Sequence, residues 1–279
     1  MKRLLSIELQ KIWKNKASRV LTITYFVLIA LLALVSSFDF NIVGIKFRLA
    51  DIGLFNFPFI WHALTYTAAV LKLFLAIVIV SMISNEYSYG TLKQNLIDGM
   101  SKKEFLLSKF YTAALFALIS TIFIFIVILI LGLSFSSYNE ASIVFQDADY
   151  LLAFFVKLMA FFSFCLFLGI LVKRSAFALG FLFIWNIVEF FLGIGFRYMF
   201  PNSNTIPEQI YRFLPLESMS ALILNPARRF QLIKTMEKQM GGAENLTDYS
   251  VNYWQVLIVL AWTVIFMLMS YKLLKKRDL

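Results

Sequence analysis

Long apolar segments are the feature that most restricts what this chain of 279 residues can fold into. A helix needs about 20 apolar residues to cross the hydrocarbon core of a bilayer. Hydrophobic residues make up 61% of the chain and charged residues only 15%, and the mean hydropathy is +0.79, so polar side chains are too few to cover a soluble domain. The sequence therefore predicts an all-α integral membrane protein, folded as one transmembrane domain over 1–279. Six segments are expected to span the membrane: 20–38, 61–84, 106–135, 150–172, 175–197 and 251–271.

The residue types that build most catalytic and metal sites are scarce. Cys165 is the only cysteine and His62 is the only histidine, which excludes a disulfide framework, a Cys-based metal cluster and any site with several histidines. The sequence also has no G-x-x-x-x-G-K-[ST] phosphate-binding loop, and it lacks the motifs expected of an intramembrane enzyme. We therefore expect no catalytic residue, no metal and no bound cofactor on this chain. If ATP drives the protein, its hydrolysis belongs to another chain.

The formal net charge of +10 is better explained by membrane topology than by nucleic-acid binding, because Lys and Arg accumulate in the cytoplasmic loops of membrane proteins. The loop between the third and fourth spans carries Glu140, Asp147 and Asp149 and no basic residue, as expected of an outer loop. Six basic residues in 197–250 oppose this orientation, but long loops weigh little in the rule. Both termini are therefore expected in the cytoplasm. The basic residues assigned to that side are Lys2, Arg3, Lys11, Lys14, Lys16, Arg19, Lys93, Lys102, Lys103, Lys109, Lys173, Arg174, Lys272, Lys275, Lys276 and Arg277.

The first residues of the chain have the pattern of an amphipathic helix. Leu5, Leu9, Ile12 and Trp13 fall on one helical stripe, and the lysines lie off it. Such a helix lies in the headgroup plane of the membrane, anchored by tryptophan and lysine. The alternative is that the positive charge only controls topology, and both interpretations can hold together.

The segment between the second and third spans predicts a short cytoplasmic helix over 85–98. Gly99 can end such a helix, because the residue after a helix end often needs a left-handed backbone. Ser101 and Glu104 have the spacing of a capping box directly before the third span. A short helix projecting there can transmit force to a soluble partner. A plain connecting loop is the alternative that the spacing leaves open.

This segment also resembles a known family. The run Glu-Tyr-Ser-Tyr-Gly-Thr-Leu-Lys at 86–93, followed by Ser-Lys-Lys-Glu-Phe-Leu-Leu-Ser-Lys at 101–109, is similar to the signature of bacterial type-2 ABC exporter permeases. The order of elements is also similar, with an amphipathic head, six spans, a coupling helix between spans two and three, and a long outer segment before span six. The resemblance implies that 85–98 docks on a separate ATP-binding subunit. By position, the residues implied to couple to the ATPase are Glu86, Tyr87, Gly90, Thr91, Leu92 and Lys93.

The same resemblance implies the remaining properties of the assembly. Two permease subunits, identical or different, would form the pathway in the cytoplasmic (inner) membrane of a bacterium, and ATP and Mg would bind the partner ATPase. The substrate would be amphipathic or hydrophobic (a lipid, a peptide or a drug-like molecule), moved out of the cytoplasm by alternating access. An ATP-independent secondary transporter or channel is the alternative.

The segment 197–250 is too long for a simple connection, and it holds four of the five prolines. Its apolar residues predict a piece that re-enters the outer leaflet or packs on the ends of the spans. After Pro226, the pattern predicts a helix over 227–240, ended by Gly241 and Gly242.

Three charged residues fall inside the expected spans and more than five residues from either end. Lys72 follows Trp61 by about 16 Å of helix rise, near the middle of the bilayer, and Glu189 is similarly deep. Charges at such depth usually face a protein interior or water, so we expect Lys72 and Glu189 either to pair or to line the substrate pathway. Lys157 lies near the outer end of its span and is expected to extend to the interface. His62 is expected to be an interfacial residue without a ligand.

Overall fold

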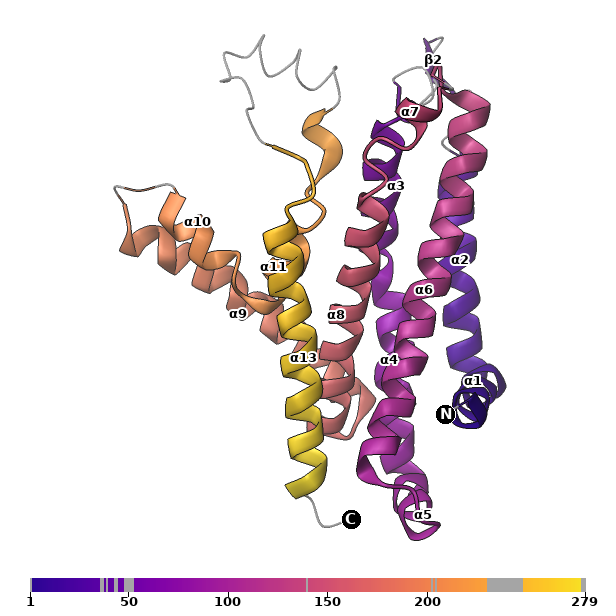
Figure 1. Cartoon of the computed structure of the whole chain (residues 1–279), viewed down its shortest axis with the longest axis vertical. Coiled ribbons are helices and arrows are strands. Elements are labelled where there is room, and N and C mark those ends of the chain that lie inside the picture. The colour runs from indigo at the N-terminus through magenta and orange to yellow at the C-terminus, as the bar shows by residue number, and fades with distance from the viewer. Residues whose placement is uncertain are drawn as a thin grey trace.

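Five helices are long and apolar enough to cross a membrane, which confirms the expectation of an all-helical protein with several membrane-spanning segments. The computed structural model (Figure 1) describes residues 2–35, 38, 40–42, 45–47, 53–138, 140–201, 203, 205–229 and 248–276. Within these residues the only strands are a short antiparallel pair, β1 (Phe40–Ile42) and β2 (Ile45–Phe47). The five helices are α2 (Lys16–Val35), α6 (Lys102–Phe135), α8 (Tyr150–Val172), α9 (Ser175–Met199) and α13 (Tyr253–Lys276).

A further apolar segment is divided between two helices. The sequence predicted one continuous span over 61–84, but the structure has α3 (Phe59–Val70) and α4 (Lys72–Ser88), bent by 43° at Leu71. Thr65 Oγ1 donates to the carbonyl of Trp61 and Thr67 Oγ1 to that of Ala63, each four residues earlier. Threonine hydroxyls bound in this way bend helices. Two such bonds lie in the turns just before the break.

Helix α8 is the centre of the bundle. It contacts α3, α4, α6, α9 and α13, and 78% of its apolar stretch is buried within the chain, against 17–33% for the other four helices. Gly169 permits the close approach of α4, because a Cβ there would lie only 3.0 Å from the side chain of Ile83. On the other side, the ring of Phe164 packs 4.8 Å from that of Phe266 in α13. The surroundings of α8 are therefore protein on nearly every side.

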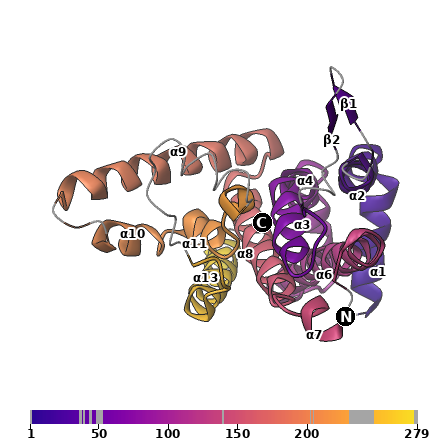
Figure 2. The same cartoon turned by 90° about the horizontal axis from the view of Figure 1, so that it is seen from above.

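Helix α9 behaves differently, because it leans away from the bundle (Figure 2). Only 17% of its apolar stretch is buried. The short helix α10 (Thr205–Tyr211) lies along it. Gly193 allows this contact, since a Cβ there would meet the ring of Tyr211 at 2.7 Å. The two helices form an arm whose apolar side chains face outward.

The segment after α9 packs on the ends of the long helices. Helix α11 (Pro215–Ala221) contacts α8, α9 and α13, and the 3-10 turn η1 (Pro226–Arg229) contacts α3. The helix expected over 227–240 lies outside the described residues beyond Arg229.

The two ends of the bundle differ in what they contain. Helix α1 (Lys2–Lys14), helix α5 (Thr91–Ile97) and the end of α13 lie towards one end, whereas β1, β2 and α7 (Ala141–Val144) lie at the other (Figure 1). Helix α1 runs across the long axis rather than along it, as the two views show together (Figures 1 and 2). The candidate site lies where α1 meets the bundle.

Candidate functional site

Four charged side chains meet at the α5 end of the bundle: Glu8 and Lys11 of α1, Glu86 of α4 and Lys109 of α6, here called the charge cluster. Lys109 Nζ lies 2.5 Å from Glu8 Oε2 and 2.6 Å from Glu86 Oε1. Lys11 Nζ lies 2.9 Å from Glu86 Oε1 and 3.4 Å from Glu8 Oε1. Lys109 is 0% exposed and Glu86 is 3% exposed. These bonds join three helices that are far apart in the sequence.

The corner between α1 and α2 brings the first two members into place. Asn15 separates the two helices, and its Oδ1 accepts a hydrogen bond of 3.1 Å from the backbone N–H of Ser18. This is the bond of an N-cap residue, so it fixes the start of α2 and lets α1 turn across the bundle. Glu8 and Lys11 are three residues apart in α1, on the side that faces α4 and α6.

The turn from α4 to α5 is fastened to the same cluster. Gly90 has a φ of +69°, a left-handed backbone that favours glycine, and it allows α5 to begin one residue later. Thr91 Oγ1 then donates to Glu86 Oε2 at 2.5 Å. The next side chain, Leu92, is 2% exposed and packs into the core. Helix α5 is therefore held at its start by one hydrogen bond to the cluster and one buried leucine.

The electrostatics of the cluster are balanced. Two carboxylates face two ammonium groups, so no net charge is buried, and each charge has a partner of opposite sign. Burial alone would lower the pKa of Lys11, but the hydrogen bond to Glu86 and the charge of Glu8 outweigh burial and raise it. A raised lysine pKa stabilises the folded state at neutral pH, and this contribution is lost only as the pH rises through the folded-state value.

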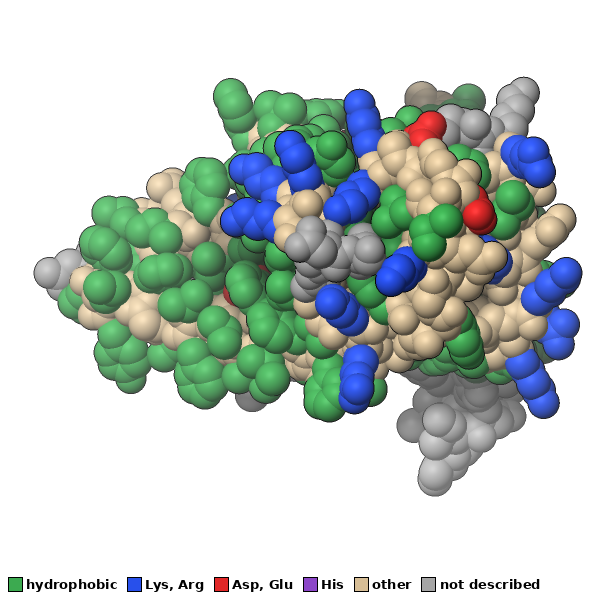
Figure 3. Space-filling model, turned by 90° about the horizontal axis from the view of Figure 1, so that it is seen from below, with side chains coloured by type: hydrophobic (Ala, Val, Ile, Leu, Met, Phe, Trp, Pro, Cys, Tyr) green, Lys and Arg blue, Asp and Glu red, His purple; other side chains and the backbone are tan. Residues whose placement is uncertain are grey.

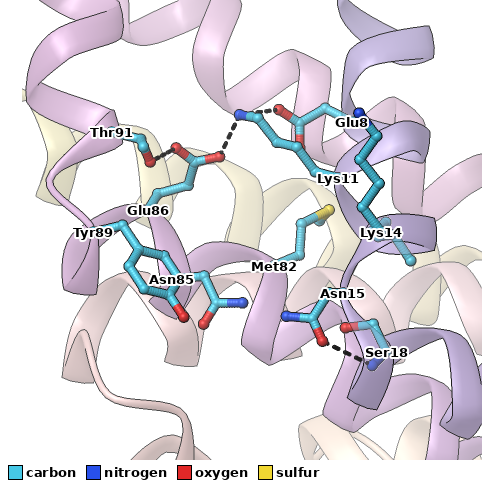
Figure 4. A pocket seen from close by; sticks show the side chains of 11 residues that line it. Glu8, Lys11, Lys14, Asn15, Ser18, Met82, Asn85, Glu86, Tyr89 and Thr91 are labelled. Carbon is cyan, nitrogen blue, oxygen red and sulfur yellow. Dashed lines mark hydrogen bonds and ion pairs between the residues drawn. The ribbon is translucent and has the colours of Figure 1, made fainter.

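A pocket of about 310 Å³ opens beside the cluster (Figure 4). Figure 4 shows Glu86 between Thr91 and Lys11, and Lys11 in turn bound to Glu8. Each charged group on this path already has a partner in the structure. In the described part of the chain, no group of three or more His, Cys, Asp or Glu side chains is placed to hold a metal ion. The pocket is lined by Glu8, Lys11, Ile12, Lys14, Asn15, Ser18, Met82, Asn85, Glu86, Tyr89 and Thr91.

The six residues implied to couple to an ATPase differ in how exposed they are. Glu86 and Leu92 point inward and are buried, while Thr91 is half-buried and binds Glu86. Tyr87 is half-buried, and its ring lies 5.7 Å from the Nζ of Lys173 in the turn between α8 and α9. The remaining two, Gly90 and Lys93, are exposed. Of the six residues, only the exposed Gly90 and Lys93 lie where a partner could readily touch them.

Two exposed apolar side chains of this element were not singled out from the sequence. Tyr89, two residues before α5, and Ile97, the last residue of α5, are each 75% exposed. Leu92 and Leu96 pack against the core, whereas Ile97 beside them is left exposed. The sequence signal that could have identified Ile97 is an apolar residue that lies off the packed face of a short helix.

The structure confirms the helix end predicted at Gly99 and the capping box predicted at Ser101 and Glu104. Gly99 has a φ of +95° and follows the end of the helix, where Met100 N donates to the carbonyl of Asn95. Ser101 and Glu104 form the expected capping box at the start of α6. Helix α5 itself is shorter than the expected 85–98, because α4 continues to Ser88.

Glu189 does not pair with Lys72. Its Oε1 accepts hydrogen bonds from Trp185 Nε1 at 2.7 Å and from Leu216 N at 3.0 Å, and its Oε2 accepts one from Glu217 N at 2.9 Å. Backbone N–H groups at a helix start lack partners within the helix and attract negative charge. Glu189 therefore binds the start of α11 and does not bind a lysine.

Three other residues of the spans also have different surroundings from those expected. Lys72 Nζ lies 4.2 Å from the centre of the Phe161 ring, a cation–π contact. Lys157 does not extend to an interface, since it is 4% exposed and belongs to the central helix α8. His62 is fully buried, with its ring stacked on Tyr150 and its Nε2 2.7 Å from the carbonyl oxygen of Leu224.

Comparison with known proteins places this chain in a family. Residues 26–279 match the family described as protein of unknown function (DUF2705). The chain belongs to this family. The match includes Glu86, Thr91 and Lys109, whereas Glu8 and Lys11 precede it. No curated protein matches the chain.

Proposed function

We propose that this chain is the transmembrane permease subunit of an ATP-driven ABC exporter, and that α5 is its coupling helix. The observation that carries the proposal is the attachment of α5. A short helix can transmit a push only if its base is stiff, and the base of α5 is fixed by Thr91 and Leu92 to a buried cluster that also holds α1, α4 and α6. A plain connecting loop needs no such joint.

The arrangement of the helices supports a layout of six spans with both termini in the cytoplasm. Counting the bent pair α3 and α4 as one span gives six crossings. An even number of crossings returns the chain to the side on which it began. This agrees with α1, α5 and the end of α13 all lying towards one end (Figure 1). Basic side chains also gather over that end (Figure 3), as expected of a cytoplasmic face. The exposed ones include Lys93, Lys103, Lys173, Arg174, Lys272, Lys275 and Lys276.

In this proposal the chain moves an amphipathic or hydrophobic substrate out of the cytoplasm of a bacterium by alternating access. ATP and Mg bind a separate ATPase subunit, which docks on the exposed side of α5. Closure of the ATPase pushes α5, and the charge cluster passes the movement to α4 and α6. Helices with two discrete arrangements are the elements that carry such coupling.

The exposed arm formed by α9 supports a contact with a second permease subunit. Ile184, Ile187 and Phe191 lie on one face of α9, and each is more than half exposed. A cysteine replacing Phe191 in a Cys165→Ser background is expected to cross-link two copies under mild oxidation, because symmetric partners bring the same residue together. A cysteine at Ile126, an exposed position of α6, is the matched control. Equal cross-linking at both positions would show random collision and contradict this contact.

The central test is purification of the tagged chain in mild detergent, followed by mass spectrometry and an ATPase assay. The proposal predicts that an ATPase with a phosphate-binding loop copurifies in about equal amount to the permease. Recovery of the chain alone, with transport that continues without any ATPase, would overturn the proposal in favour of a secondary transporter or channel.

A further inference from the structure

Two lysines lie inside the bundle without a carboxylate partner. Lys72 is the first residue of α4, directly after the bend at Leu71, and Lys157 belongs to the central helix α8. Lys157 is 4% exposed and Lys72 is half-buried. Neither ammonium group forms an ion pair in the described part of the chain. By contrast, the buried Lys109 binds two carboxylates, so the lack of a counter-charge is particular to this pair.

The two lysines are close neighbours along one side of α8. Lys72 Nζ lies 4.2 Å from the centre of the Phe161 ring. Phe161 follows Lys157 by four residues in α8, about one helical turn, so the two side chains leave the helix on the same side. The charge of Lys72 also acts on Lys157. Two charges of the same sign therefore lie near each other within apolar segments.

The acidic residues nearby do not balance these two charges. Glu189 is already bound by Trp185 and by backbone N–H groups of α11. Glu217 of α11 is the acidic residue whose charge acts on Lys157, but among the described residues it forms no ion pair. Buried charges are normally paired, and ionisable residues within a membrane usually mark the path of a substrate or ion. The missing counter-charge therefore points to an anion from outside the chain.

We infer that Lys72 and Lys157 bind the anionic group, a phosphate or a carboxylate, of an amphipathic ligand whose apolar part packs among the helices around α8. Charge complementarity selects this ligand, because two ammonium groups without a carboxylate match one anion. A cation would be repelled, and a neutral molecule would leave both charges unbalanced. The bend at Leu71 agrees with this site, since broken helices form the binding sites of many membrane transporters. Naming the ligand as the transported substrate rests on the proposed function.

The binding test uses two probes with the same alkyl chain and opposite charge, octyl phosphate and octyltrimethylammonium. Each is titrated calorimetrically into the full chain in a neutral detergent. We expect saturable binding of octyl phosphate at one site per chain and no saturable binding of the cation. Equal binding of the two probes would show that the alkyl chain alone is recognised and would overturn the inference.

Variants then assign the binding to the two lysines. Lys72→Gln and Lys157→Gln should each weaken octyl phosphate binding about tenfold or more, because each removes a charge-assisted hydrogen bond. Lys173→Gln is the matched control, since it removes an exposed charge from the turn after α8 and should change the affinity less than about twofold. Equal losses in all three variants would show general attraction of anions and contradict the site.

Stability without ligand gives an independent test of the missing counter-charge. Lys157→Met removes a buried charge that has no partner in the protein, so the unfolding temperature should equal or exceed that of the wild type. The reaction of buried Cys165 with a thiol-specific dye on heating reports this temperature. Octyl phosphate should raise it in the wild type and leave it unchanged in Lys157→Met. A fall as large as that in Lys109→Met would show that Lys157 has a counter-charge within the chain and would overturn the inference.

The complex with the copurified ATPase separates a substrate from a resident lipid, which could present the same phosphate. Octyl phosphate should stimulate ATP hydrolysis by the wild-type complex but not by the Lys157→Gln complex. Binding that leaves ATP hydrolysis unchanged would assign the site to a resident lipid and overturn the substrate assignment. Binding to a chain that copurifies with no ATPase would contradict the proposed function alone. Copurification of the ATPase without saturable octyl phosphate binding would contradict this inference alone.

Discussion

Replacing Lys109 with Met is expected to lower the free energy of unfolding by about 3–5 kcal/mol, the usual effect of removing one partner from a buried ion pair. Lys109 is fully buried and binds both Glu8 and Glu86. Without it, Lys11 is the only cation of the cluster that remains, and it is partly exposed. One carboxylate is then left buried without adequate compensation. At about 2–4 °C for each kcal/mol in a chain of this size, the unfolding temperature should fall by roughly 6–20 °C.

The single buried cysteine of this chain provides the measurement. Cys165 is 0% exposed in the central helix, so a thiol-specific dye reacts only as the bundle opens on heating. Lys103→Met is the matched control, because Lys103 is an exposed residue of the same helix and should change stability by less than about 0.5 kcal/mol.

A double variant distinguishes the loss of charge balance from the loss of packing. Lys109→Met combined with Glu8→Met leaves only Lys11 and Glu86, one cation and one anion, and should recover at least half of the lost stability. Equal unfolding temperatures for Lys103→Met and Lys109→Met would contradict the assignment of a stabilising cluster.

The spans were predictable because each depends on nearby residues. An uncharged apolar stretch of about 20 residues defines a membrane helix by itself, and α8 occupies the predicted 150–172. The start of α6 was equally predictable from nearby residues, because a capping box needs only Ser101 and Glu104. The bend at Leu71 was missed, although Thr65 and Thr67 were visible as residues able to bond back to the helix.

The charge cluster was not predictable, because its bonds join distant parts of the chain. Glu8 and Lys109 are 101 residues apart and Lys11 and Glu86 are 75 apart, and no periodicity relates them. Glu86 was selected through a family resemblance, as a residue facing a partner, whereas the structure directs it inward. Burial of a side chain depends on which helices meet, and a single element does not determine that.

The pairing of Lys72 with Glu189 was wrong for a related reason. A side chain of opposite charge is only one of the partners that a charged group can have inside a membrane. Backbone N–H groups at the start of α11 and the indole of Trp185 satisfy Glu189 instead. Lys72 is placed over an aromatic ring. The two backbone partners cannot be recognised before the position of α11 against α9 is known, whereas Trp185 lies one helical turn before Glu189 and was visible in the sequence.

Replacing Ile97 with Asp is expected to reduce the amount of copurified ATPase more than tenfold. Ile97 and Tyr89 are the two large exposed apolar side chains at the tip of the proposed coupling element. Exposed aromatic and aliphatic residues at the centre of an interface often contribute 2 kcal/mol or more to binding, about thirtyfold in affinity. An aspartate at this position would also place an unpaired charge in the contact.

The controls separate contact with the partner from folding of the permease. Phe145→Asp alters an exposed apolar residue that directly follows α7, which lies at the opposite end of the bundle (Figure 1), and the amount of bound ATPase should not change. Leu92→Ala removes a buried side chain of α5 and should lower the unfolding temperature, because truncating a buried leucine costs about 2–5 kcal/mol. Ile97→Asp should leave that temperature within about 2 °C of wild type.

The two substitutions in α5 therefore test different statements about one helix. Loss of the ATPase in Ile97→Asp, with normal folding, requires a partner that contacts the exposed side of α5. If Ile97→Asp and Phe145→Asp retain the same amount of a copurifying ATPase, then that ATPase binds elsewhere, and α5 is only the connection between α4 and α6. In that case the charge cluster would still determine stability, because Ile97 takes no part in its bonds.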